Sequence, residues 1–171
     1  HPSHFCTRRC LCNRMRDRTL AGETAVVTGA ARGIGRAIAE RMAADGAAVV
    51  VADVDAEGGT ETADRIGDDG GEAGFVETDV TDPDAVAALL EATADRFGGP
   101  DVFVNNAGGS FDDDALTRLS LDEWRRILEV NLTGTFVCSR EAVSRMVDGG
   151  GGRLVHVASV NARHGIGLTA Y

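Results

Sequence analysis

The sequence predicts an α/β fold in which helices cover both faces of a parallel sheet of about five strands. Three observations support this prediction. A glycine-rich turn follows the apolar residues 25–27 and leads directly into a helical pattern. Residues 47–52 are all apolar, as expected of a strand that is buried on both faces of a parallel sheet. Strand and helix patterns then alternate along the chain, which is typical of a doubly wound, Rossmann-type sheet.

Apolar runs, capping residues and glycine stops place the elements of this sheet. The expected strands are residues 24–28, 47–52, 74–78, 101–104 and 153–158. The expected helices are residues 33–45, 57–69, 84–97 and 120–146. Asp82 with Pro83 marks one helix start, and Ser120 with Glu123 forms a capping box at another. Apolar side chains recur at helical spacing in the last helix, and we expect most of them to lie in the core. They are Trp124, Ile127, Leu128, Leu132, Phe136 and Val143.

Composition limits the classes of function. The 171 residues are enough for one domain, and 43% of them are hydrophobic. The net charge is -10 and all 17 basic residues are Arg, so we expect no nucleic-acid partner, because phosphate binding needs a basic surface. No apolar run approaches the roughly 20 residues of a membrane span, so no membrane partner is expected. The acidic, lysine-free composition fits either a high-salt cytosol or a GC-rich genome. Few cysteines in the main part of the chain indicate a cytoplasmic location.

Residues 1–14 differ from the rest, because they contain three of the four Cys, three Arg and no acidic residue. A metal could be held by His1, His4, Cys6, Cys10 and Cys12. Zinc sites usually combine two separate ligand pairs, whereas the remaining cysteine, Cys138, stands alone in a helical pattern. The segment also lacks the apolar stretch of a signal peptide. We therefore expect no metal site, and interpret residues 1–14 as a disordered tail or as translation upstream of a start at Met15. Residues 15–171 are the predicted nucleotide-binding domain.

The glycine-rich turn has the spacing T-G-x-x-x-G-x-G, with glycines at positions 29, 33 and 35. Glycine allows positive φ and leaves no Cβ in the way, so backbone N–H groups can approach a pyrophosphate. The first-turn amides and the dipole of the following helix then favour that anion. The predicted cofactor-binding residues of this turn are Thr28, Gly29, Ala31, Arg32, Gly33, Ile34 and Gly35.

Three motifs together resemble the short-chain dehydrogenase/reductase family. The first is the turn spacing, the second is Asn105-Asn106-Ala107-Gly108, and the third is Ser159 at a strand end followed by Tyr171. The resemblance covers residues 20–171. It implies a hydride transfer between NAD(P) and a small alcohol, sugar or 3-oxoacyl-type carbonyl substrate. It also implies that the long helix from Ser120 lines a subunit interface in a homotetramer or homodimer.

The cofactor preference depends on Asp53, which stands at the end of the second strand, 18 residues after Gly35. A carboxylate there accepts hydrogen bonds from ribose hydroxyls and repels a 2′-phosphate, so NAD is expected over NADP. The alternative is that Asp53 is an ordinary loop aspartate. Arg32 in the turn favours NADP instead, because a basic residue there could meet a 2′-phosphate. The resemblance further implies that Asp79 and Val80 lie at the adenine, where Asp79 could equally be a turn residue. It places Asn106, Ala107 and Gly108 along the cofactor's ribose.

The resemblance implies a catalytic set of Asn131, Ser159 and Tyr171. Ser159 would hydrogen-bond the substrate oxygen, Tyr171 would exchange a proton with it, and Asn131 would hold a water in a proton relay. His156, inside the last strand, is interpreted as a packed or hydrogen-bonded histidine rather than a catalyst. His164 lies between Ser159 and Tyr171 and could touch substrate, but is interpreted as exposed.

In the family a Lys four residues after the Tyr lowers the pKa of the Tyr from about 10. The sequence contains no Lys and ends at Tyr171, so we interpret it as a carboxyl-terminally truncated dehydrogenase whose fragment has little or no turnover. It would leave the fifth strand as an uncovered edge. The alternative is a non-catalytic dinucleotide-binding protein or an inactive fragment.

Overall fold

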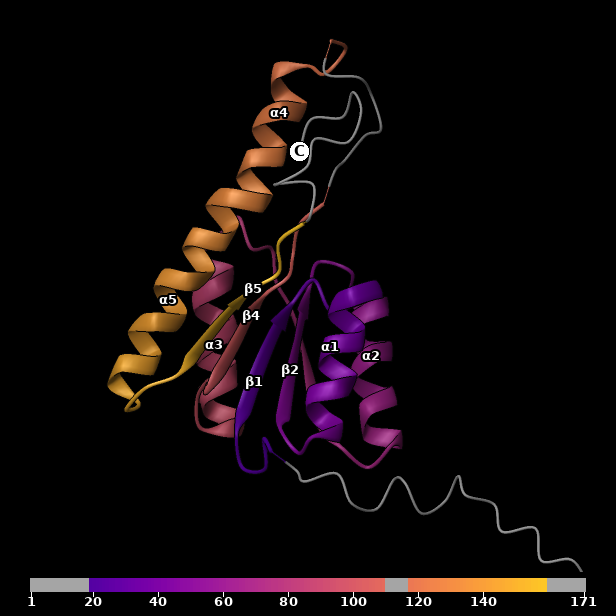
Figure 1. The fold of residues 1–171 in the computed structure, drawn as a ribbon, viewed down its shortest axis with the longest axis vertical. Coiled ribbons are helices and arrows are strands. Elements are labelled where there is room, and N and C mark those ends of the chain that lie inside the picture. Colours follow the sequence, from indigo (N-terminus) through magenta and orange to yellow (C-terminus); the bar gives the residue numbers. More distant parts are fainter. Residues whose placement is uncertain (1–18, 110–116, 160–171) are drawn as a thin grey trace, which may run out of the picture.

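A parallel five-stranded sheet forms the centre of the molecule (Figure 1). The computed structural model describes residues 19–109 and 117–159. The strands are β1 (Thr24–Thr28), β2 (Ala48–Asp53), β3 (Glu72–Glu77), β4 (Val102–Asn105) and β5 (Arg153–His156). Their order in the sheet is β3-β2-β1-β4-β5, and every neighbouring pair is parallel. The predicted doubly wound parallel sheet is therefore confirmed, with β3 beginning two residues earlier than expected.

Helices cover both faces of this sheet. They are α1 (Gly33–Ala44), α2 (Ala56–Asp68), α3 (Pro83–Phe97), α4 (Leu121–Leu128), the π-helical segment η1 (Glu129–Gly134) and α5 (Thr135–Asp148). Figure 1 shows α1 and α2 on one side of the sheet and α3 and α5 on the other. None of the helices in the described part of the chain combines the length and apolarity that a membrane crossing needs.

Two apolar layers hold the helices on the sheet, because successive strand residues point to opposite faces. In β1, Ala25 and Val27 pack with residues of α1 and α2, whereas Val26 packs with residues of α3 and α5. In β4, Val104 and Phe103 divide between the two layers in the same way. Both faces of the central strands are thus buried, which explains why these strands are apolar throughout rather than alternating.

The strand order changes direction between β1 and β4. The chain moves outward from β1 to β2 and β3, then returns to place β4 on the other side of β1. The two strands pair in register, with Val26 opposite Phe103. In open α/β sheets, ligands bind at such a point, beyond the carboxyl ends of the strands. The fold therefore directs attention to the segments that follow Thr28 and Asn105.

Local signals set most helix ends as the sequence predicts. Asp82 is the N-cap of α3 and accepts a hydrogen bond from the amide of Asp84 at 2.9 Å, with Pro83 in the first turn. Ser120 and Glu123 form the capping box of α4. Gly98 ends α3 in a left-handed conformation. The side chains of Asp82 and Ser120 thus accept hydrogen bonds from amide groups that the first turn of a helix leaves without an acceptor.

The long helix expected over residues 120–146 is not regular. It continues to Asp148, but η1 interrupts it with a π-helical segment. One side chain within η1 and one just after it bond to backbone carbonyls of the helix. The Asn131 amide donates to the Ile127 carbonyl oxygen at 2.9 Å, and the Thr135 hydroxyl donates to the Asn131 carbonyl oxygen at 2.8 Å. A π-helical segment inside an α-helix often occurs at a functional position.

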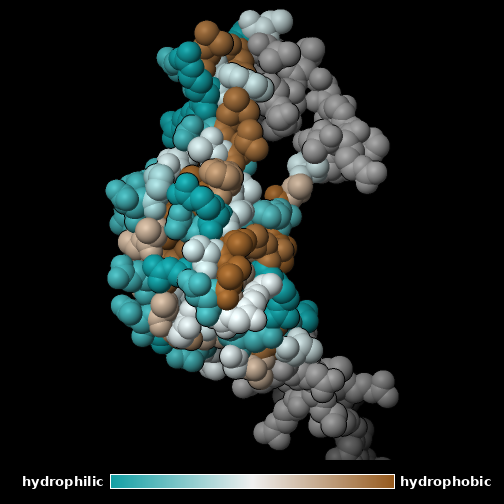
Figure 2. Space-filling view, turned by 90° about the vertical axis from the view of Figure 1, so that its left-hand side faces the viewer, coloured by the Kyte–Doolittle hydropathy of each residue, from teal (hydrophilic) through white to brown (hydrophobic). Residues whose placement is uncertain are grey.

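The expectation that most apolar residues of this helix lie in the core is wrong. Trp124, Leu132, Phe136 and Val143 are 40%, 65%, 60% and 43% exposed, respectively, whereas Ile127 is buried. The side of α5 that packs on the sheet is formed instead by Val137, Cys138, Ala142 and Met146. The helix is therefore apolar on two faces, and periodicity alone does not separate them. Figure 2 shows apolar side chains recurring along the outer face.

The strand β5 forms one edge of the sheet, as expected, and its residues are largely exposed. His156 is exposed, so the packing expected for it is not found, and its interpretation as non-catalytic stays a prediction. Cys138 is 1% exposed, and burial raises the pKa of its thiol to about 12. A thiol with this pKa stays protonated near neutral pH, so Cys138 is a core residue rather than a nucleophile.

Candidate functional site

The glycine-rich turn connects β1 to α1 and folds tightly against β4. Gly29 has a φ of 65°, and a Cβ on it would lie 2.8 Å from the Cα of Ala107. A Cβ on Gly35 would collide with the Gly29 carbonyl oxygen and with the side-chain amide of Asn106. These two glycines are thus required by close backbone contacts inside the protein itself.

Hydrogen bonds from Thr28 and Asn106 join this turn to the end of β4. The Thr28 hydroxyl accepts from the amides of Asn106 and Ala107, each at 3.0 Å, and donates to the Val104 carbonyl oxygen at 3.2 Å. In return, the Asn106 side chain donates to the carbonyl oxygens of Thr28 at 2.9 Å and Gly29 at 3.0 Å. Thr28 is 1% exposed, so its side chain shapes the turn from inside.

The beginning of α1 differs from the other helix starts described above. Among the described residues, its N-cap Arg32 makes no side-chain cap hydrogen bond, and its first turn holds no acidic side chain. Gly33 has a φ of 57°, and the position of a Cβ on it is in open space. The Ile34 side chain is 66% exposed. First-turn amides have no acceptor within their own helix, so this end of α1 can receive an anion.

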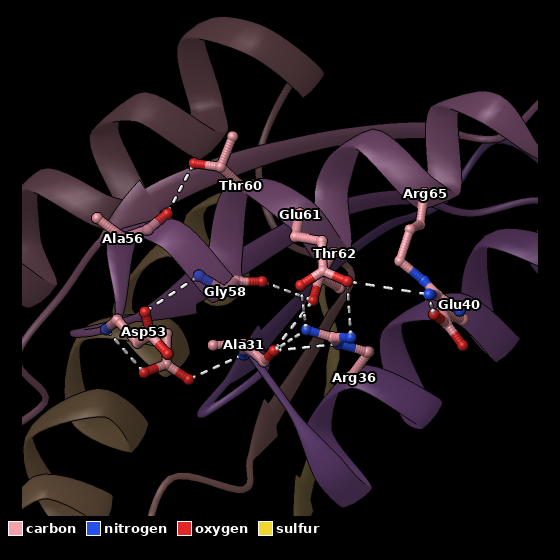
Figure 3. Close-up of polar contacts among 11 residues, drawn as sticks. Ala31, Arg36, Glu40, Asp53, Ala56, Gly58, Thr60, Glu61, Thr62 and Arg65 are labelled. Atoms are coloured by element: carbon pink, nitrogen blue, oxygen red, sulfur yellow. Dashed lines mark hydrogen bonds and ion pairs between the residues drawn. The ribbon is translucent and has the colours of Figure 1, made fainter.

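Asp53, the last residue of β2, stands beside this turn (Figure 3). One of its carboxylate oxygens accepts from the Ala31 amide at 2.9 Å, and the other from the Asp55 amide at 3.1 Å. Asp55 in turn caps α2 through the amide of Gly58. Asp53 ends the second strand as expected, and the structure brings it to the glycine-rich turn, while its contact with a ribose stays a prediction.

Asp79 and Val80 lie between β3 and α3. The exposed Asp79 carboxylate accepts from the amide of Thr81 at 2.9 Å and from its hydroxyl at 2.7 Å, which is the contact of a turn residue. The Val80 side chain is 7% exposed, and a Cβ on Gly134 would lie 2.8 Å from its Cγ2 atom. Val80 therefore belongs to the core.

Asn131, in η1, is tied to the segment after β4. Its side-chain oxygen accepts from the Gly109 amide at 3.0 Å, and its side-chain nitrogen donates to the Gly109 carbonyl oxygen at 2.9 Å. A Cβ on Gly108 would lie 2.5 Å from that side-chain oxygen. The Asn131 side chain therefore leaves no room for a Cβ at position 108, independently of the expected approach of a cofactor.

The expected catalytic residues are only partly described. Ser159 is exposed and follows β5, which pairs with β4, so it stands at the same carboxyl edge of the sheet as Asn106. Tyr171 and His164 lie outside the described residues, as does the amino-terminal segment of residues 1–14. Within the described ranges, His, Cys, Asp and Glu side chains form no group of three or more that could hold a metal ion.

The comparison with protein families agrees with this geometry. The model of the family described as short chain dehydrogenase matches residues 23–171. The chain belongs to the short-chain dehydrogenase family.

Known members of the family show how far the likeness extends. The chain is 46% identical over 140 residues to the cis-4-hydroxycyclohexanecarboxylate dehydrogenase of Sinomonas cyclohexanicum, covering 82% of this chain and 56% of that one. It is 41% identical over 141 residues to a 3-oxoacyl-acyl-carrier-protein reductase of Vibrio cholerae, covering 82% and 56%. The crystal structure of a short-chain type dehydrogenase/reductase from Mycobacterium marinum matches with a TM-score of 0.82 at 36% identity, over 86% of this chain and 60% of that one. The chain therefore spans little more than half the length of these relatives.

Two polar residues near the glycine-rich turn were not found by sequence reasoning. The Arg36 guanidinium and the Thr62 hydroxyl both donate to the Ala31 carbonyl oxygen. In the sequence, Arg36 resembles an ordinary surface residue of α1, and Thr62 a polar residue of α2. No local pattern indicates that the two helices meet at this carbonyl.

The contact between Thr28 and β4 can be tested by removing only the hydroxyl. In Thr28→Val, the half-buried amides of Asn106 and Ala107 lose their acceptor, so we expect the free energy of unfolding to fall by about 2 kcal/mol. Thr28→Ser is the matched control, because it keeps the hydroxyl and loses one methyl group, at about 0.8 kcal/mol. Urea unfolding followed by circular dichroism measures both. Equal stability of the two variants would show that the hydroxyl does not hold the turn.

Proposed function

We propose that this chain is the nucleotide-binding part of an oxidoreductase that transfers a hydride between NAD and an alcohol or carbonyl substrate. The observation that carries the proposal is the combination at the start of α1. A helix end without a side-chain cap faces open space at Gly33, and the Asp53 carboxylate stands beside it on a neighbouring strand. The first element suits a pyrophosphate and the second suits ribose hydroxyls.

The residues present fit a dinucleotide. In the proposal, the turn from Gly29 to Gly35 holds the pyrophosphate, and Asp53 holds the adenosine ribose. The backbone at Asp79 and Val80 borders the adenine, and Asn106, Ala107 and Gly108 border the second ribose. Nicotinamide, when bound, supplies the site that accepts or donates the hydride.

The chain's own residues would handle the substrate oxygen and its proton. Ser159 would donate a hydrogen bond to that oxygen, on which negative charge develops during reduction of a carbonyl. Tyr171 would give the oxygen a proton, or take one during oxidation of an alcohol. Asn131 would contribute to the proton relay, with its side chain held by Gly109 and Ile127. This assignment rests on the family resemblance and concerns the whole protein.

The substrate is proposed only as an alcohol or carbonyl compound. One relative is named for a hydroxycyclohexane carboxylate and another for a 3-oxoacyl group on a carrier protein. These two substrates differ in size and shape. What they share is the exchange between a hydroxyl and a carbonyl group.

We further propose that the protein forms a homodimer or homotetramer through the outer face of α4 and α5. Leu121, Trp124, Leu132, Phe136, Val143 and Val147 are exposed along these helices. An exposed apolar stripe of this kind is typical of a protein–protein interface. Water contact with these side chains is unfavourable, and a second copy of the same face would remove it.

The first test of the proposed site uses two glycines with the same backbone property. Gly33 and Gly22 both have positive φ, at 57° and 83°, and a Cβ on either would meet open space. Gly33→Ala and Gly22→Ala should therefore each destabilise the fold by about 1–2 kcal/mol. Only the methyl group at position 33 would occupy the space beside the first-turn amides of α1. We expect Gly33→Ala to weaken NADH binding at least tenfold, measured by isothermal titration calorimetry, and Gly22→Ala to change it less than twofold. Equal affinities in the two variants would contradict the site.

The preference for NAD can be tested at Asp53. Asp53→Asn removes the negative charge and keeps one oxygen for the Ala31 amide, although the bond from the Asp55 amide is lost. We expect the ratio of NADP to NAD affinity to rise at least tenfold, because the repulsion of the 2′-phosphate is gone. Asp55→Asn is the control, since it removes a neighbouring charge and leaves a residue that still caps α2. An affinity ratio that moves equally in both variants would exclude a specific role of Asp53.

Assembly can be tested by placing a charge on the outer face of α5. Phe136→Glu should shift the protein toward monomer in sedimentation velocity, because a buried carboxylate at an apolar interface is costly. Val54→Glu is the control, as Val54 is 63% exposed and lies outside this face, whereas Phe136 is 60% exposed. A parent chain that is monomeric at all concentrations, or a dimer unaffected by Phe136→Glu, would exclude this interface.

A further inference from the structure

Both backbone polar groups of Ala31, which belong to consecutive peptide units, are hydrogen-bonded (Figure 3). Its N–H donates to the Asp53 carboxylate at 2.9 Å. The Ala31 carbonyl oxygen accepts from Nη2 of Arg36 at 2.6 Å and from Nε of Arg36 at 3.0 Å. The Thr62 hydroxyl shares its one proton between this oxygen at 3.3 Å and the Gly58 carbonyl oxygen at 2.9 Å. Ala31 is 1% exposed, so these bonds form where water does not compete strongly.

Arg36 is itself fixed by a second helix. Its Nη1 and Nη2 atoms donate to the two carboxylate oxygens of Glu61 at 3.3 and 3.2 Å. The Arg36 side chain is 23% exposed, against 56% for Glu61. A guanidinium held by a bidentate carboxylate has a defined orientation, and this orientation aims it at the Ala31 carbonyl.

The same network offers an arginine whose side-chain bonds, among the described residues, reach no group of the turn itself. Arg65 of α2 pairs with Glu40 of α1 at 3.0 Å and with Glu61 at 3.9 Å. Like Arg36, it links α1 to α2 through carboxylates. Its guanidinium thus bonds to carboxylates rather than to the Ala31 carbonyl, so it separates a general contribution to helix packing from an effect on the turn.

Hydrogen bonds to the two peptide units that flank Ala31 restrain the direction in which the chain enters α1. The Ala31 N–H belongs to the Ala30–Ala31 unit and the Ala31 carbonyl to the Ala31–Arg32 unit. Each unit is planar, so a bond to each restrains the orientation of two consecutive planes. Arg32 and Gly33 come next in the chain and begin α1. The orientation at Ala31 therefore sets the direction in which the first amides of α1 point.

We propose that Arg36 and Thr62 are positioning residues that set the shape of the glycine-rich turn before a dinucleotide binds. They act through the Ala31 carbonyl and need no contact with the cofactor. A turn that is already in its binding conformation loses less freedom on binding, which increases affinity. The effect on affinity rests on the proposed dinucleotide site, whereas the effect on the turn itself does not.

The test compares Arg36→Met with Arg65→Met in the 171-residue chain. Methionine keeps much of the apolar stem of arginine and removes every donor. In the cofactor-free protein, NMR-detected hydrogen exchange reports on the amides of Ala30 and Ala31, which are bonded to the Ala52 carbonyl and to Asp53. We expect about tenfold faster exchange of both amides in Arg36→Met, and less than a twofold change in Arg65→Met. NADH affinity by calorimetry should fall about tenfold in the first variant only.

A second pair of variants decides the question if Arg36→Met does not fold. Thr62→Val removes the hydroxyl, and Thr62→Ser keeps it, so serine should restore both the slow exchange and the affinity that valine loses. Equal effects of Arg36→Met and Arg65→Met, or of the two Thr62 variants, would overturn the proposal. A parent chain that does not bind NADH would refute the dinucleotide site, while the exchange rates would still decide whether Arg36 and Thr62 hold the turn.

Discussion

The contact between the end of β1 and the end of β4 is the constraint on which the rest of this structure depends. Thr28 and Asn106 are 78 residues apart in the chain, yet their backbone and side-chain groups satisfy each other. This exchange is possible only because Gly29 and Gly35 lack side chains where the two segments touch. The reversal of strand order, the opening of α1 and the surface beyond the strands are all fixed at this one place.

Polar contacts extend this constraint outward to the neighbouring elements. Asp53 reaches the turn from β2, and Arg36 and Thr62 reach it from α1 and α2. Asn131 fixes the segment after β4 by binding both backbone groups of Gly109. The segments at the carboxyl ends of the strands are therefore held by hydrogen bonds that form without any ligand. A site built in this way is expected to bind with little rearrangement.

The sequence predicts those features that short-range chemistry determines. The apolar run at β2, the caps at Asp82 and Ser120, and the glycine spacing each have a local physical cause, and all appear in the fold. The π-helical segment is not visible in periodicity, because it depends on the bonds of Asn131 and Thr135 to carbonyls of their own helix. The exposure of Phe136 and Leu132 is equally hidden, since an apolar residue facing a partner and one facing the core have the same spacing. The hydrogen bonds from Arg36 and Thr62 to the Ala31 carbonyl oxygen form only where α1 and α2 meet. No pattern within a single segment of the sequence predicts that meeting.

The most direct measurement of the central claim is a titration of the isotope-labelled chain with NAD, followed by amide chemical shifts in NMR. We expect the shifts to concentrate at the carboxyl ends of the strands, at residues 29–35, at Asp53 and at residues 106–108. The shifts of amides near the amino-terminal ends of the strands, such as those of Gly46, Gly98 and Gly150, should not change. Shift changes confined to the amino-terminal ends, or no changes at millimolar NAD, would contradict a dinucleotide site at the junction of β1 and β4.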